Sequence, residues 1–244
     1  MKLRNLIQIA SLALGLAVLA SASPVTVNFV GGYGTPVNGV VSNGNKEIYY
    51  PYVINVNGSN IIVACDDVND SVTGGETWQA TVNHFTDPAG TSITGGMFAS
   101  ATPTAQQITN YQQAAWLYTQ FDGLSTPPPG YNYDEVNAAI NYAIWDIFNG
   151  GNPSLASIGP ANTASAYWLN AANVATANNY YGMDFSNFVI FTPTGVGQPQ
   201  GTLPQEYIGE VPEPASLALL GTGLLGLAFL FKRRLHDGVL DVQN

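Results

Sequence analysis

The residue best suited to covalent chemistry is Cys65, which is the only cysteine of the chain. A single cysteine cannot form a disulfide within one chain, so its thiol is either a small buried apolar group or a reactive sulfur. Two later segments share one pattern, since Asn141 and Gln112 each precede a tryptophan by four residues. This spacing fits two amphipathic helices that each bury a tryptophan.

Two further constellations could support hydrolysis. His84 is the only histidine outside the C-terminal tail, and a Cys65–His84 pair could activate a thiolate, although a solvated histidine explains it equally well. Paired carboxylates for glycoside hydrolysis could come from Glu76, Glu135 or Asp146. Nothing around these residues forms a recognisable motif. We therefore expect no catalytic residues and no cofactor.

The acidic residues that follow Cys65 could offer oxygen ligands to calcium. Asp66, Asp67, Asp70 and Glu76 lie close together in the sequence, but their spacing does not match an EF-hand loop. Zinc is excluded because the chain has too few cysteines and histidines. The expected metal content is none, with calcium binding left open.

Hydrophobic periodicity indicates the elements that would position these residues. Alternating β-branched and aromatic residues predict strands at 25–30, 47–56, 60–64, 76–85 and 187–193. A period of 3.6 predicts helices at 104–121, 134–149 and 164–178. Thr104 and Gln107 have the form of a capping box at the first of them. The pattern indicates an α+β fold, a β-rich sandwich or barrel with an inserted helical subdomain.

The body of the chain is similar to a known surface domain in one respect. Cys65-x-Asp67 after a strand, followed by Ala143-Ile144-Trp145, resembles the thioester domain of bacterial surface adhesins over about residues 49–191. The resemblance implies an internal thioester, which is an activated acyl group, between the cysteine and a glutamine of a Gln-x-Ala-Ile-Trp motif. The glutamine position is Asn141 here, whose side chain is one methylene shorter, about 1.5 Å, so the cross-link would need a shift of the backbone. Gln112, which stands four residues before Trp116, is the alternative partner.

Both ends of the chain carry targeting features. At the N-terminus, Lys2 and Arg4 precede an apolar run and the small residues Ala20-Ser21-Ala22, which predicts a signal peptide at 1–22. Residues 215–231 form an uncharged run of about 25 Å as a helix, which is at the short end for a transmembrane span. These features predict an exported globular domain at 23–194, a linker at 195–210, a sorting segment with a transmembrane helix at 211–234 and a cytoplasmic tail at 235–244.

The C-terminal segment has three parts in a fixed order: a box, the apolar run and a basic cluster. The box and the cluster are Val211, Pro212, Glu213 and Pro214, then Lys232, Arg233 and Arg234. This order resembles the PEP-CTERM sorting signal of Gram-negative bacteria. The resemblance implies recognition by an exosortase at the inner membrane, cleavage near the box and export together with exopolysaccharide. The protein would then be anchored transiently or permanently before it reaches the cell surface or the extracellular space.

The charge of the exported part excludes one class of partner. Between residues 23 and 211 the only basic residue is Lys46, against 13 acidic residues, which gives a net charge of −12. Such a domain repels nucleic acid, whose binding depends on Lys and Arg at phosphates. We expect a non-enzymatic cell-surface or extracellular-matrix protein, associated with exopolysaccharide, biofilm or a surface nucleophile. A covalent adhesin with an internal thioester and a secreted polysaccharide or peptide hydrolase are the alternatives.

Overall fold

The structure is a computed structural model and describes residues 24–33, 37–40, 46–49, 51–121, 133–149, 164–194 and 203–210. The expected signal peptide, the residues of the box and the basic cluster, and the apolar run at 215–231 lie outside these ranges. Within them, no helix is both long and apolar enough to span a bilayer. Contacts divide the chain into two units, residues 1–210 and 211–244.

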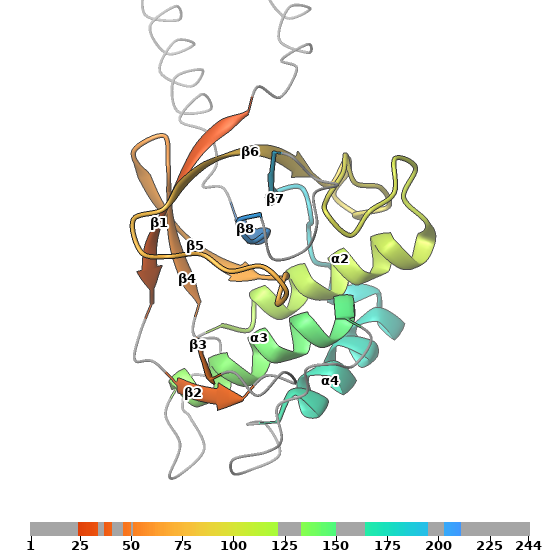
Figure 1. Ribbon diagram of the computed structural model, residues 1–244. Helices are drawn as coiled ribbons and strands as arrows, with labels where there is room; N and C mark the ends of the chain where they lie inside the picture. Colours follow the sequence, from red (N-terminus) through yellow and green to blue (C-terminus); the bar gives the residue numbers. More distant parts are fainter. Residues whose placement is uncertain are drawn as a thin grey trace, which may run out of the picture. The chain divides into compact units, whose positions relative to one another are not determined.

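Six antiparallel strands form a closed barrel in the order β1-β4-β5-β8-β7-β6 (Figure 1). They are β1 (Val25–Gly32), β4 (Tyr52–Val56), β5 (Ser59–Cys65), β6 (Thr77–His84), β7 (Phe188–Pro193) and β8 (Tyr207–Glu210). The hairpin between β4 and β5 turns at Asn57-Gly58, where both residues have positive φ, 51° and 90°, as a two-residue primed turn requires. Of the two architectures left open by the sequence, sandwich or barrel, the structure has the barrel.

The predicted strand at 47–56 is in fact two strands. Its first part is β3 (Lys46–Tyr49), which pairs with β2 (Val37–Val40) in a separate two-stranded sheet, and its second part is β4. The division falls at Pro51, which has no N–H to continue a ladder. The Pro51 carbonyl instead accepts from the Tyr33 N–H at 2.7 Å. A single proline therefore separates the small sheet from the barrel.

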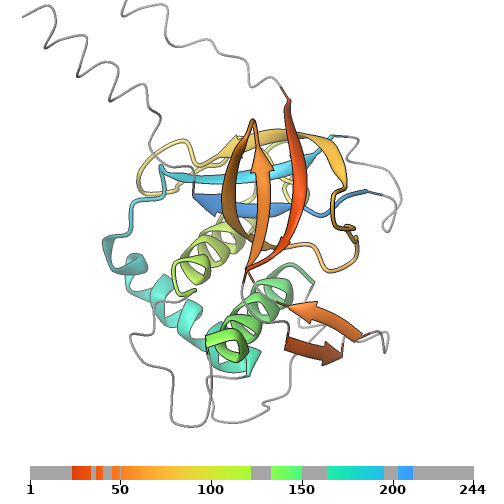
Figure 2. The same ribbon diagram turned by 90° about the vertical axis from the view of Figure 1, so that its left-hand side faces the viewer.

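Among the described residues between β6 and β7, the sequence forms three α-helices, which confirms the inserted helical subdomain. They are α2 (Ala105–Tyr118), α3 (Tyr133–Asn149) and α4 (Ser165–Ala177), followed by the 3-10 turn η2 (Asn179–Gly182). The predicted capping box is present, because the Thr104 side chain accepts from the Gln107 N–H and the Gln107 side chain accepts from the Thr104 N–H. Figure 2 shows the helices packed on one side of the barrel.

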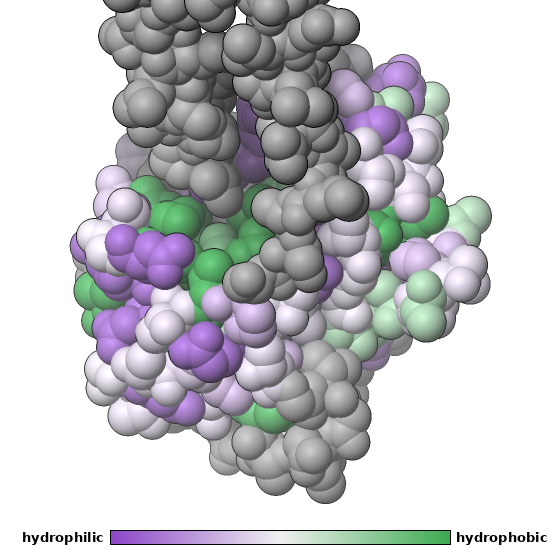
Figure 3. Space-filling model, turned by 90° about the horizontal axis from the view of Figure 1, so that it is seen from above, coloured by the Kyte–Doolittle hydropathy of each residue, from purple (hydrophilic) through white to green (hydrophobic). Residues whose placement is uncertain are grey.

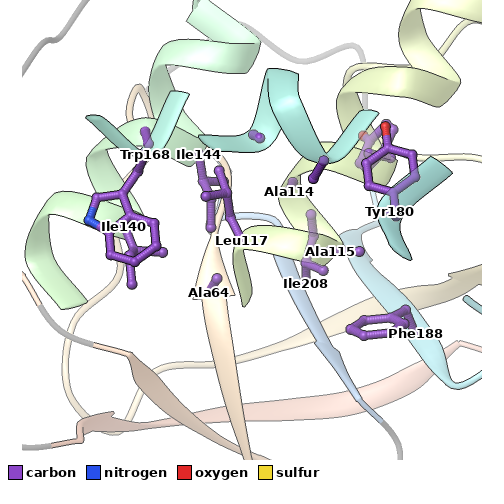
Figure 4. Close-up of a cluster of buried hydrophobic side chains, with 14 of the residues drawn as sticks. Ala64, Ala114, Ala115, Leu117, Ile140, Ile144, Trp168, Tyr180, Phe188 and Ile208 are labelled. Atoms are coloured by element: carbon purple, nitrogen blue, oxygen red, sulfur yellow. The ribbon is translucent and has the colours of Figure 1, made fainter. Parts of the chain in front are cut away.

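The main core lies between the helices and one side of the barrel (Figure 4). Ala64 of β5, Phe188 of β7 and Ile208 of β8 face the helices, and each is at most 1% exposed. Full burial of one large apolar side chain contributes about 1.5–3 kcal/mol. The alternate residues point into the barrel, where the Tyr207 ring contacts those of Tyr52 and Trp78 at centroid distances of 5.8 and 6.2 Å. On the face shown in Figure 3, hydrophilic residues are spread among smaller groups of hydrophobic ones.

The predicted linker at 195–210 is wrong over its last part. Strand β8 lies between β5 and β7, and Gly209 pairs with Val63 on one side and Val189 on the other. The folded body therefore extends to Glu210. Four strand residues are too few to show a period in the sequence, and only their pairing with distant strands identifies them as part of the barrel.

Candidate functional site

Cys65 and Asn141, which the sequence proposed as partners, are in contact. Cys65 is the last residue of β5 and is fully buried. The ladder with β4 ends at Val63, and the Cys65 N–H donates instead to Asn141 Oδ1 of α3 at 3.3 Å. The Cys65 thiol donates to the backbone carbonyl of Asp67 at 3.0 Å. Helix α3 thus caps the end of the strand that carries the only cysteine.

Only the oxygen of the Asn141 carboxamide has a hydrogen-bond partner among the described residues. Its side chain is fully buried, and its Nδ2 has no hydrogen-bond partner among the described residues. A buried donor without an acceptor costs about 1–3 kcal/mol. One turn further along α3, the Trp145 indole N–H interacts with the Cys65 thiol, and the Trp145 ring packs against Tyr142 at 5.2 Å. The thiol and the amide therefore lie in one fully buried site between β5 and α3.

The electrostatic environment keeps the thiol protonated. Burial raises the pKa of Cys65 well above its usual value, and the negative charges of Asp67 and Asp66 raise it further. The interaction with Trp145 lowers the pKa of Cys65, but by less than burial and the two aspartates raise it. An activated cysteine has the opposite setting, an electropositive and partly exposed one that stabilises the thiolate. Cys65 is therefore poorly suited to be a catalytic nucleophile at neutral pH.

A pair of buried carboxyl groups lies beside this site. Glu206 immediately precedes β8 and accepts from the Met97 N–H at 2.6 Å, the Tyr111 hydroxyl at 2.6 Å and the Thr192 hydroxyl. These donors partly offset the effect of burial, which raises the pKa of Glu206. Glu206 is therefore the member of the pair that is better able to carry the negative charge.

Asp66 is the member that holds the proton. Its pKa is raised well above the usual value by burial and then by the charge of Glu206. A protonated Asp66 can donate to Glu206, and these effects outweigh the hydrogen bond from its own backbone, which lowers the pKa. The two groups can therefore share a proton in a fully buried position.

A second acidic group, Asp67 with Asp70, follows Asp66 in the sequence. The pKa of Asp67 is raised from 3.8 to about 7, first by burial and then by its hydrogen bond with Asp70. Gln205 Nε2 donates to the backbone carbonyls of both residues, at 3.1 and 2.8 Å, and ties this loop to the start of β8. Across the described ranges, His, Cys, Asp and Glu side chains form no group of three or more that could hold a metal ion.

The remaining predicted residues lie elsewhere. The Gln112 amide donates to the carbonyls of Ala89 and Gly90 at 3.2 and 3.0 Å, so its donor groups are used within a different loop. His84 is exposed at the end of β6, whereas Cys65 is fully buried. Of the two carboxamides, the structure therefore brings only Asn141 to the thiol.

Two of the three carboxylates considered for hydrolysis, Glu135 and Asp146, lie too far apart to act as a pair. Glu76 accepts from the Thr73 N–H at 2.9 Å in the connection between β5 and β6. Glu135 and Asp146 are both on α3, eleven residues apart, which is about 16 Å along the helix axis. Glycosidases hold their carboxyl groups about 5–10 Å apart. Burial raises the pKa of Asp146 to about 6, and a hydrogen bond from Ser165 opposes this shift.

Sequence reasoning missed the residues that build the acidic network around Cys65. Glu206 and Gln205 fall in the segment that was expected to be a linker, and Tyr111 was considered only as part of a helix face. One signal was available: Glu206 precedes the strand-like residues Tyr207 and Ile208, which would be unusual in a solvated linker.

Comparison with known families identifies one segment. Residues 210–234 match the PEP-CTERM protein-sorting motif, and this range includes the predicted box and the basic cluster. No curated protein and no solved structure matches the chain. The motif indicates an exported protein that an exosortase sorts at the membrane. The resemblance of the body to a thioester domain has no support from these comparisons.

Proposed function

We propose that this chain is a cell-surface or extracellular-matrix protein that acts by binding, and that its C-terminal motif delivers it through an exosortase. The observation that carries the proposal is the match at residues 210–234, which follows directly on a folded domain. The acidic, almost lysine-free body fits a role in a hydrated extracellular matrix such as exopolysaccharide or a biofilm.

Two features favour binding over catalysis. The Cys65 thiol is buried and kept protonated, so it lacks the properties of a cysteine hydrolase. The interacting carboxyl groups of Asp66 and Glu206 are fully buried, so a polymer could not reach them. A general acid must lie within hydrogen-bond reach of its substrate, and neither site provides that access.

The sorting proposal is tested by deleting the exosortase. In cells with the enzyme, the full chain is expected as a shortened form at the cell surface or in the medium. In cells without it, the unshortened chain should stay in the membrane fraction, as should the P212A/P214A variant in cells that have the enzyme. Immunoblots of the fractions measure both, and unchanged fractionation without the enzyme would refute the proposal.

A covalent adhesin is a second candidate, which the contact between Cys65 and Asn141 favours. In this reaction a bond forms between Cys65 Sγ and Asn141 Cγ, the Cγ–Nδ2 bond breaks, and the thiol proton leaves with Nδ2 as ammonia. The Nδ2 group, which has no hydrogen-bond partner, would be the group that departs. A nucleophile on a matrix or host molecule would later take over the acyl group.

Intact mass decides between the two candidates. A thioester makes the mature protein about 17 Da lighter than its sequence, and methylamine should add to it and release the thiol. The controls Cys65→Ala and Asn141→Ala should have their full calculated masses and should not react with methylamine. A wild-type protein of full mass, with one free thiol after unfolding, would exclude the thioester and leave the first candidate.

A further inference from the structure

The barrel ends where the sorting motif begins. Glu210 is both the last residue of β8 and the first residue of the matched segment, and Pro212 of the box follows two positions later. No linker separates the strand from the box, contrary to what the sequence had suggested.

Strand β8 is an interior strand of the barrel. Gly209 pairs with Val63 of β5 and with Val189 of β7, and Glu210 pairs with Phe188. At the other end of the strand, Glu206 is held by the hydroxyls of Tyr111 and Thr192. The backbone of β8 is therefore engaged on both sides up to the edge of the motif.

This pairing conflicts with the way in which enzymes bind an extended chain. Recognition of an extended segment uses the N–H and C=O groups of its backbone and pockets for its alternate side chains. In the closed barrel, residues 207–209 pair with both β5 and β7, Glu210 pairs with β7, and the side chains of Tyr207 and Ile208 are fully buried. The enzyme could then bind the motif only on its C-terminal side.

We propose that β8 controls the cleavage of the sorting motif, because its C-terminal end must leave the barrel before the enzyme can bind both sides of the bond to be cut. This inference rests on the proposed function. Cleavage breaks one peptide C–N bond: the acyl group passes to water or another nucleophile, whose proton goes to the departing amine. When local opening is fast compared with cutting, the rate of cutting follows the population of the open form.

An inserted spacer tests whether β8 limits cleavage, without changing the residues by which the enzyme recognises the motif. Insertion of Gly-Ser-Gly-Ser-Gly-Ser between Glu210 and Val211 of the full chain leaves β8 and the box unchanged and supplies free backbone between them. Pulse-chase labelling in cells with the exosortase should show the shortened form appearing at least about fivefold faster. The same insertion between Gly197 and Gln198, before β8, is the matched control and should change the rate less than about twofold.

A second variant opens the strand without lengthening the chain. Tyr207→Ala removes the ring that contacts Tyr52 and Trp78 and should speed shortening several-fold, with faster hydrogen exchange at the Gly209 amide. If that variant does not fold, the spacer still decides. Shortening that requires the exosortase but is equally fast with and without the spacer would overturn the inference alone. Fractionation that does not depend on the exosortase would overturn the proposed function instead.

Discussion

Gly96 lies directly against the hydroxyl of Tyr111, and a Cβ at this position would be 2.3 Å from that oxygen. The same hydroxyl donates to Glu206 Oε1 at 2.6 Å and accepts from the Phe98 N–H at 3.1 Å. The close approach of a glycine therefore permits the hydrogen bond that links α2 to the start of β8.

Gly96→Ala should destabilise the folded protein by about 2–4 kcal/mol, because the new methyl group must displace the Tyr111 ring from a close-packed site. Gly74→Ala is the matched control, since nothing lies within 4 Å of a Cβ at that position. Its free energy of unfolding should stay within about 0.5 kcal/mol of the wild type. Urea titration measures both, and equal midpoints for the two variants would contradict the close approach.

The bond between Tyr111 and Glu206 should appear as a coupling energy. Tyr111→Phe and Glu206→Gln each remove part of one hydrogen bond, so each should lower the free energy of unfolding by about 1–3 kcal/mol. The double variant should lose less than the sum, with a coupling of about 0.5–3 kcal/mol. Tyr118→Phe with Glu206→Gln is the control pair, because the Tyr118 hydroxyl donates to the Ile62 carbonyl instead. Additive losses in the first pair would show that the bond contributes nothing.

Stability should fall as the pH rises through neutrality. Asp67 has a pKa raised from 3.8 to about 7 in the fold, and burial also raises the pKa of Asp66 well above its usual value. The folded chain therefore keeps protons that the unfolded chain releases, so this stabilisation is complete below about pH 4 and is lost towards and above pH 7.

The free energy of unfolding should accordingly be about 1–3 kcal/mol lower at pH 8 than at pH 5, as measured by urea titration. Asp67→Asn removes one of these titrations and should flatten the profile. Asn170→Ala, which removes no titrating group from the exposed face of α4, should leave its slope unchanged. A wild-type protein that is more stable at pH 8 than at pH 5 would contradict the shared-proton arrangement.

The contact between Asn141 and Cys65 should also contribute to stability when no bond joins them. Asn141→Ala removes the acceptor of the Cys65 N–H and should lower the free energy of unfolding by about 1–2 kcal/mol. The loss is limited because the variant also removes Nδ2, a buried donor without a partner among the described residues. Asn170→Ala, on the exposed face of α4, is the control and should cost less than about 0.5 kcal/mol. Thermal unfolding of the Cys65→Ala form of each variant measures the difference without any contribution from a thioester.

The elements that sequence patterns predicted are those with strong local signals. The helix that begins after Thr104 has both a capping box and a 3.6-residue period, and both hold in the structure. The pairing of Cys65 with Asn141 was implied by the resemblance to a thioester domain, and the hydrogen bond between them requires the ladder of β4 to stop short of Cys65.

The parts that could not be predicted depend on contacts between distant residues. Strand β8 has only four residues, and its identity comes from pairing with β5 and β7. Glu206 looked like a solvated acid of a linker because nothing local shows that it meets Asp66 and Tyr111. The single strand predicted at 47–56 is wrong for a local reason, because Pro51 interrupts the ladder and divides it into β3 and β4.

The ladder between β5 and β8 joins segments 142 residues apart in the sequence, with Cys65 opposite Tyr207. Of the six barrel strands β8 comes last in the sequence, so the barrel cannot close before that strand has been made. Pairings between such distant segments also form slowly, because a large loop must be ordered first. Until then, the edges of β5 and β7 that pair with β8 remain open.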